Sequence, residues 1–209
     1  MKTSIEFLGG AGTVTGSKYL VRHENQKILI DCGLFQGLKT LRVRNWNPLP
    51  VNVSEIDAVV LTHAHVDHSG YIPRLIKDGF RGKIYASEAT FELCKILLPD
   101  SGYLMEEEAA YLNKRQKTKH SPALPLFTQA EAEEALRYFS PVPFDSRVNL
   151  GNDVSFELAY AGHIFGAAQI ILQCGERKIA FTGDIGRMQD PLLYPPAKLP
   201  GADYLVLES

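Results

Sequence analysis

The sequence predicts an α/β fold in which two β-sheets pack face to face and helices cover the outside. Three observations support this prediction. Short strand-like runs recur along the chain, a continuous apolar run at residues 58–61 is typical of a strand buried on both faces, and helical patterns are clustered mainly in the middle. Elements of these kinds bury their apolar faces when they stack in layers around one core.

The individual elements follow from hydrophobic periodicity and capping residues. Expected strands cover residues 5–8, 18–22, 27–30, 58–61, 83–86, 154–159, 169–174, 178–182 and 204–207. Expected helices cover residues 69–77, 87–98 and 128–139. Ser87 is a typical N-cap for the second helix, and Thr128 with Glu131 forms a capping box on the third. Residues 34–50 and 113–126 are expected to be loops.

Composition is ordinary for a soluble domain. The chain has 209 residues, 45% of them hydrophobic and 22% charged, so residues 1–209 fit one domain. The net charge of -2 excludes a global basic field for nucleic acid. Cys32, Cys94 and Cys174 are far apart and form no C-x-x-C pair, which argues against a disulfide framework. With no signal-like N-terminus and no long apolar stretch, we expect a cytoplasmic protein without a membrane span.

A positively charged surface that binds nucleic acid would therefore have to be a local patch. Two stretches are candidates: Arg42, Arg44 and Trp46 in the first expected loop, and a basic run in the second, made of Lys114, Arg115, Lys117, Lys119 and His120. Such a run is more often a solvated surface than a phosphate-binding patch, and the sequence alone leaves both interpretations open.

The strongest chemical signal is a cluster of metal-binding side chains directly after the buried strand. His63, His65, Asp67 and His68 fall within six residues. Residues two apart in an extended chain point to the same side, so His63 and His65 can bind one ion, while Asp67 and His68 can face a second. Imidazole and carboxylate ligands without thiolate favour catalytic zinc over iron or manganese. A lone histidine would indicate little, but this density predicts a metal site.

Two further residues complete the ligand set by type. His163 and Asp184 each follow an expected strand and have glycines beside them, which permit close backbone approach. Asp31, at the end of another strand, is better interpreted as a group that orients the ligands from behind. The glycine-rich start does not indicate a dinucleotide cofactor, because Gly10, Gly12 and Gly16 miss the required spacing and a strand follows them.

These motifs resemble the metallo-β-lactamase superfamily, whose hallmark H-x-H-x-D-H is present at residues 63–68. More narrowly, the sequence is similar to the β-CASP group of RNA-processing nucleases. The narrower similarity rests on six blocks that occur in the family's order, at residues 7–17, 30–37, 61–75, 162–168, 182–187 and 207–209.

The resemblance implies an αββα sandwich of two mixed sheets and a site with two zinc ions and a bridging hydroxide. By resemblance, His63, His65 and His163 bind the first zinc, Asp67 and His68 bind the second, and Asp184 bridges both. Asp67, Asp184 and Glu208 are the expected catalytic carboxylates, and Glu208 matches a glutamate that supports a catalytic histidine from a later part of the chain. The implied substrate is single-stranded RNA, cut to a 5′-phosphate and a 3′-OH. A homodimer and partners in a processing complex both stay open.

In the family, the Leu-Glu-Ser motif at residues 207–209 leads into an inserted β-CASP domain and then into a return to the first sheet sandwich. The return supplies another ligand to the second zinc and the acid for the leaving group. Ending at Ser209, this chain is expected to be truncated before that insertion. The second site is then expected to lack one ligand and to bind metal more weakly than the first. The chain alone is expected to be a slow nuclease. The alternatives are a hydrolase of another ester, thioester or lactone, and an inactive binding fragment.

Overall fold

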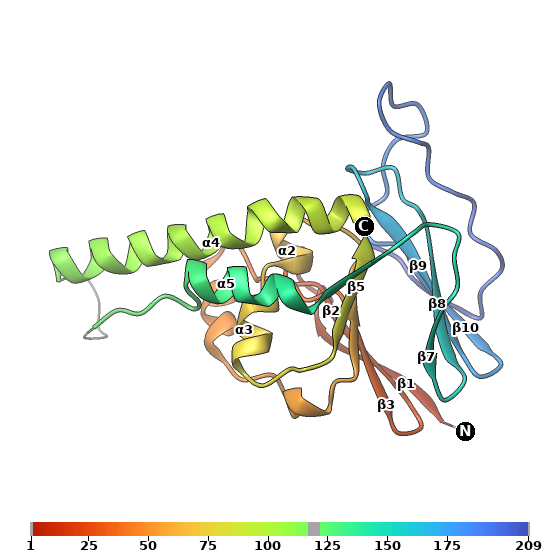
Figure 1. Cartoon of the computed structure of the whole chain (residues 1–209), viewed down its shortest axis with the longest axis horizontal. Coiled ribbons are helices and arrows are strands. Elements are labelled where there is room, and N and C mark those ends of the chain that lie inside the picture. Colours follow the sequence, from red (N-terminus) through yellow and green to blue (C-terminus); the bar gives the residue numbers. More distant parts are fainter. Residues whose placement is uncertain (1, 117–121, 209) are drawn as a thin grey trace.

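The computed structural model describes residues 2–116 and 122–208 (Figure 1). Within these ranges, the strands form a six-stranded sheet A and a five-stranded sheet B. In spatial order, sheet A contains β1 (Thr3–Gly9), β2 (Lys18–His23), β3 (Gln26–Ile30), β4 (Ala58–Val60), β5 (Lys83–Ser87) and β6 (Phe139–Val142). Sheet B contains β11 (Tyr204–Val206), β10 (Arg177–Phe181), β9 (Ala168–Cys174), β8 (Val154–Tyr160) and β7 (Val148–Gly151).

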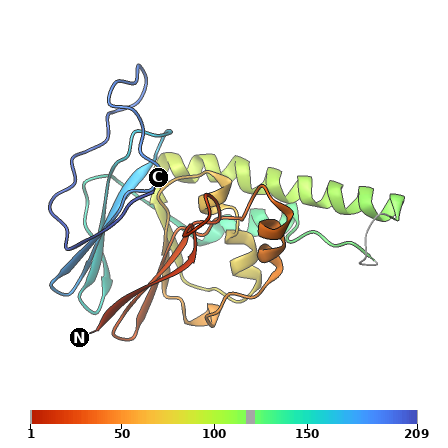
Figure 2. The same cartoon turned by 180° about the vertical axis from the view of Figure 1, so that it is seen from behind.

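Both sheets are mixed, which confirms the predicted fold class. In sheet A the strands β1 to β3 are antiparallel and β3 to β6 run parallel. In sheet B the strands β7 to β10 are antiparallel, and β11 joins β10 in parallel. Figures 1 and 2 show the two sheets facing each other, with the described helices gathered on the sheet A side.

The alternation of side chains along sheet A explains why its inner strands are apolar on both faces. Leu20 and Leu29 point into a core beneath the helices. Their neighbours Val21 and Ile28 point instead into a second core between the sheets, where Phe156 and Leu172 of sheet B meet them. Sheet A is therefore the middle layer, and a strand in the middle layer needs no polar face.

The helices pack against sheet A, and the longest differs from the prediction. They are α1 (Lys39–Arg42), α2 (Val66–Ser69), α3 (Ile72–Lys77), α4 (Glu88–Arg115) and α5 (Gln129–Ala135), with 3₁₀ turns at Val43–Trp46, Val53–Glu55 and Leu136–Tyr138. The sequence predicts that the second helix ends near residue 98, because proline disfavours a helix interior. That end is wrong: α4 continues through Pro99, and packing of Gly102 against the start of α5 outweighs the local cost.

The other corrections concern short or half-exposed elements. Residues 34–50 contain α1 and a 3₁₀ turn as well as loop, and the expected helix at 69–77 is split into α2 and α3. Strands β6 and β7 were not predicted, since neither contains a fully buried residue. The capping box at Thr128 and Glu131 is confirmed. Among the described helices, none combines the length and the apolar character needed to cross a membrane.

Candidate metal centre

The candidate site lies where five strands reach their carboxyl ends. β3 and β4 run parallel, while β8 and β10 share one direction as the two antiparallel neighbours of β9. β11 is parallel to β10. Each of these strands is followed by one predicted site residue, in the order Asp31, His63, His163, Asp184 and Glu208. Parallel strands therefore deliver these side chains to one edge of the sandwich, where ligands gather in open α/β sheets.

A short loop between β4 and α2 positions the first two histidines. The backbone amide of Ala168 donates a 2.8 Å hydrogen bond to the carbonyl of Thr62, which ties this loop to sheet B. Ser69, at the end of α2, donates its hydroxyl to the carbonyl of Ala64 at 2.8 Å. The loop is thus fixed at both ends, and its side chains project from a rigid base.

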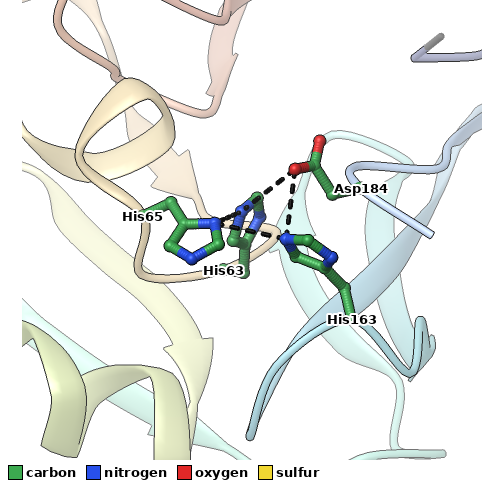
Figure 3. Close-up of side chains that lie close together, drawn as sticks. All are labelled: His63, His65, His163 and Asp184. Atoms are coloured by element: carbon green, nitrogen blue, oxygen red, sulfur yellow. Dashed lines mark hydrogen bonds and ion pairs between the residues drawn. The ribbon is translucent and has the colours of Figure 1, made fainter. Parts of the chain in front are cut away.

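Three histidines and one aspartate converge on a single point, as Figure 3 shows. His63 Nε2 lies 3.0 Å from His65 Nδ1, which in turn lies 3.2 Å from His163 Nε2. Asp184 Oδ2 lies 3.2 Å from His163 Nε2 and 3.8 Å from His63 Nε2. Ligands at roughly 2.0–2.1 Å from a tetrahedral zinc are spaced by about 3.3 Å, so these atoms fit one zinc ion. The structure thus brings His163 to the H-x-H pair, although about a hundred residues separate them in sequence.

The protonation of this group also suits a metal. Burial lowers the pKa of His63, and the neighbouring histidines lower it further. Burial lowers the pKa of His163 as well. Both imidazoles are consequently neutral at physiological pH, which is the form that binds metal ions. Thr62 Oγ1 lies 3.0 Å from His63 Nδ1 and leaves the Nε2 atom facing the cluster.

His68 occupies a second, more acidic position. Its Nε2 atom lies 3.9 Å from Asp67 Oδ2, 3.6 Å from Asp184 Oδ1 and 3.5 Å from Glu208 Oε2. Burial alone would lower the pKa of His68, but the carboxylates of Asp31, Glu208 and Asp67 outweigh burial and hold that pKa at about 9. His68 therefore carries a proton at neutral pH, and a metal ion bound at this position would have to displace it.

Asp31 supports this position from behind. The carboxylate is fully buried and accepts hydrogen bonds from the Thr62 amide at 2.7 Å, the Thr62 hydroxyl at 2.7 Å and His68 Nδ1 at 2.8 Å. Three bonds within the protein leave this carboxylate little capacity for a metal ion. Although one of its oxygens lies within 4.8 Å of a ligand atom of His68 and of Glu208, its contacts fit a residue that orients His68.

Glu208 has a partner that sequence reasoning missed. Its Oε1 atom accepts a 2.8 Å hydrogen bond from the Tyr19 hydroxyl. Burial raises the pKa of Glu208 to about 7, and the same burial raises the pKa of Tyr19. Tyr19 belongs to β2, where only its alternation toward the sheet interface could have pointed to this role.

The basic run lies apart from the centre, whereas Asp67 lies at its edge. The Oδ2 atom of Asp67 is 3.9 Å from His68 Nε2, although Asp67 belongs to neither of the two tight groups of ligand atoms. Lys114 and Arg115 lie at the far end of α4, whose 28 residues span about 40 Å, whereas its first turn contacts Gly166 beside His163. Lys117, Lys119 and His120 are outside the described residues.

Comparison with known proteins agrees with the family that the motifs resemble. The metallo-beta-lactamase superfamily model matches residues 11–207. Ribonuclease TTHA0252 of Thermus thermophilus is 35% identical over 96% of this chain and 42% of its own length. Cleavage and polyadenylation specificity factor 73 of Drosophila melanogaster is 29% identical over 98% of this chain and 28% of its own. This chain thus spans less than half the length of either relative.

Structural similarity points the same way. The metallo-beta-lactamase fold protein YhfI from Bacillus subtilis superposes with a TM-score of 0.54 at 17% identity, covering 90% of this chain and 64% of YhfI. At that identity the likeness shows the fold alone. Together with the match over residues 11–207, it confirms the family predicted from the sequence: the chain belongs to the metallo-beta-lactamase superfamily.

Proposed function

We propose that this chain is the metal-carrying part of a zinc-dependent ribonuclease with two metal positions. The observation that carries the proposal is the placement of Asp184 between two sets of ligands. Its Oδ2 atom faces His63 and His163, and its Oδ1 atom faces His68 at 3.6 Å. A carboxylate whose two oxygens face two imidazole groups is suited to bridge two ions.

The other residues have distinct tasks in this proposal. His63, His65 and His163 would hold the first zinc, and Asp67 with His68 would hold the second, while Asp31 keeps the His68 ring in place. The metal pair would supply a water whose pKa is lowered toward about 7 and would neutralise charge on phosphoryl oxygens. Glu208, held by Tyr19, is positioned to accept or supply a proton at the edge of the second position.

RNA is the proposed substrate because relatives that cover nearly the whole chain are named as a ribonuclease and as a cleavage and polyadenylation specificity factor. The metal cluster alone would equally serve thioester, lactone or other ester hydrolysis, so substrate class must be tested separately. Both relatives are more than twice as long as this chain, and we propose that a further domain of the whole enzyme, of the β-CASP kind, binds the RNA strand.

The test separates the metal platform from the RNA-binding apparatus. Zinc-loaded protein would be given bis(p-nitrophenyl) phosphate, a 5′-labelled single-stranded RNA, a thioester and a lactone. The activated phosphodiester needs neither a leaving-group acid nor a long binding surface, so we expect it to be hydrolysed, with the RNA cut slowly. Asp184→Ala should abolish both reactions. Faster turnover of the thioester or lactone than of either phosphodiester would overturn the proposal.

A further inference from the structure

The glycine-rich block at residues 9–17 contains no metal ligand, yet it contacts the peptide that carries two of them. The backbone amide of Ser17 donates a 2.9 Å hydrogen bond to the carbonyl of Asp67. The carbonyl of Ser17 accepts in turn from the amide of Gly33 at 3.0 Å. The block, the segment after β3 and the start of α2 therefore meet as three backbones in direct contact.

The segment after β3 follows α2 closely. The amide of Cys32 donates to the carbonyl of His68 at 2.7 Å, and the amide of Leu34 donates to that of Val66 at 2.9 Å. Between them, Gly33 touches Asp67 so closely that an added Cβ would lie 1.5 Å from the Asp67 carbonyl oxygen. Any shift of this segment must therefore move the peptide that carries Asp67 and His68.

Lys18 connects the two supporting segments. Its side chain is almost completely buried, at 1% exposure, and its Nζ atom donates to the carbonyl of Gly33 and, at 3.4 Å, to that of Gly16. The same ammonium lies 4.7 Å from the centre of the Phe35 ring and 4.8 Å from that of Tyr71. Carbonyl dipoles and aromatic faces thus stabilise the charge.

This burial needs a reason, because a buried cation is expensive unless it is paired. Among the ion pairs of residues 2–116 and 122–208, none includes Lys18. Burial lowers the pKa of Lys18 to about 8. A methionine would fill much of the same space without this electrostatic cost, so packing alone does not explain a lysine at this position.

We propose that Lys18 is a positioning residue for the second metal position: by tying the carbonyls of Gly16 and Gly33 together, it fixes the peptide that carries Asp67 and His68. The inference rests on the proposed function only in treating Asp67 and His68 as ligands. His63, His65 and His163 make no described contact with Lys18, so its effect should be confined to one of the two metal positions.

The first test needs no metal. Amide hydrogen exchange of metal-free Lys18→Met would be followed by NMR, with the amides of β9 as an internal reference. We expect exchange at Ser17 and Gly33 to become at least about tenfold faster relative to β9, since Lys18 no longer holds the carbonyls of Gly16 and Gly33 in the two segments that carry these amides. A control, Leu172→Ala in the core between the sheets, should change both sets of amides together. Unchanged exchange at Ser17 and Gly33 would overturn the proposal.

The second test measures metal binding by calorimetry with zinc. Lys18→Met should weaken the weaker of two binding events by about 10–100-fold, the range for partners behind a ligand, and leave the tighter event unchanged. Leu172→Ala should leave both events unchanged. Equal weakening of both events in Lys18→Met would show a general structural role and overturn the proposal. Phe35→Leu, which removes one ring beneath the ammonium, should give a smaller loss with the same selectivity, and it substitutes if Lys18→Met does not fold.

The two proposals can fail separately. If wild-type protein binds a single zinc, the two-metal function is wrong, and the metal-free exchange experiment still decides whether Lys18 fixes the Asp67 peptide. If two ions bind and Lys18→Met alters neither exchange nor the second affinity, the function stands and the role of Lys18 is wrong.

Discussion

The two halves of the candidate centre are built on different principles. The group of His63, His65 and His163 draws its members from both sheets, and its ring nitrogens already have zinc-like spacing. The position around His68 is surrounded by carboxylates and holds a proton. In the proposed function, the first half would bind a metal through the spacing of its ligand atoms and the second through its negative charge, so the two should respond differently to mutation and to pH.

The largest effect is expected where the halves share a residue. Asp184→Ala removes the carboxylate between both positions, so both zinc affinities should fall and phosphodiester hydrolysis should drop by at least about 10³-fold, beyond the 10–100-fold typical of an outer partner. Zinc content by mass spectrometry and hydrolysis of the activated phosphodiester measure this. Loss at only one position would show that Asp184 does not bridge.

The second largest effect is expected in the pH dependence of zinc affinity, which should differ between the two halves of the centre. The pKa of His68 is about 9 without metal, so below pH 9 each metal bound there must release a proton. Affinity at this position should therefore rise about 100-fold between pH 6.5 and pH 8.5, at roughly tenfold per unit. At the first position, the lowered pKa values of His63 and His163 predict a much flatter response. Chelator competition at several pH values measures both, and parallel slopes would contradict the comparison.

Asp31→Asn tests how far the second half depends on its support. The amide can still accept a hydrogen bond but carries no charge, so the pKa of His68 should fall and its ring should be held less firmly. We expect the second zinc to bind about 10–100-fold more weakly through lost orientation, with the first unaffected. A lower pKa of His68 in the variant would also make its proton easier to displace, which favours zinc binding. Calorimetry at pH 8.5, close to the wild-type pKa of about 9, keeps this opposing effect small. Leu172→Ala again serves as the control for general destabilisation.

The smallest effect is a pH-dependent stability. The pKa of Lys18 is lowered from 10.5 to about 8 in the folded chain, so the unfolded chain binds this proton more tightly. The cost of burying the charge is fully present below pH 8 and disappears toward pH 10.5. Relative to Lys18→Met, wild-type stability should therefore rise by about 1 kcal/mol per pH unit above pH 8. Urea denaturation of both proteins at pH 7.5, 8.5 and 9.5 measures the difference, and a constant gap would contradict it.

The sequence predicts the parts of the site that follow local rules. Asp31, His63, His163 and Asp184 each follow a recognisable strand, and strands of one direction end at one edge. The structure places all four there, although the role of each as a ligand or a support stays a prediction. Glu208 lies at the same edge beside His68.

What the sequence could not predict depends on contacts between distant segments. Tyr19 and Lys18 are neighbours on β2. Their alternation indicates only which face of the sheet each side chain occupies, and it does not identify Glu208 and Gly33 as their partners. The continuation of α4 past Pro99 has the same cause, because its stabilising contacts lie on α5. Local propensity is a weak guide wherever tertiary packing provides the larger share of the free energy.

The mixed strand order has a consequence for how the protein folds. β7 to β10 are sequential antiparallel neighbours, so their contacts are local, whereas β3 to β6 need long crossovers to pair in parallel. Local contacts form fast and distant parallel pairing forms slowly, so β7 to β10 should assemble before β3 to β6. The three-histidine group takes its members from both sheets and exists only once the sheets have docked. Zinc should therefore act after the folding barrier, slowing the unfolding rate while leaving the folding rate almost unchanged.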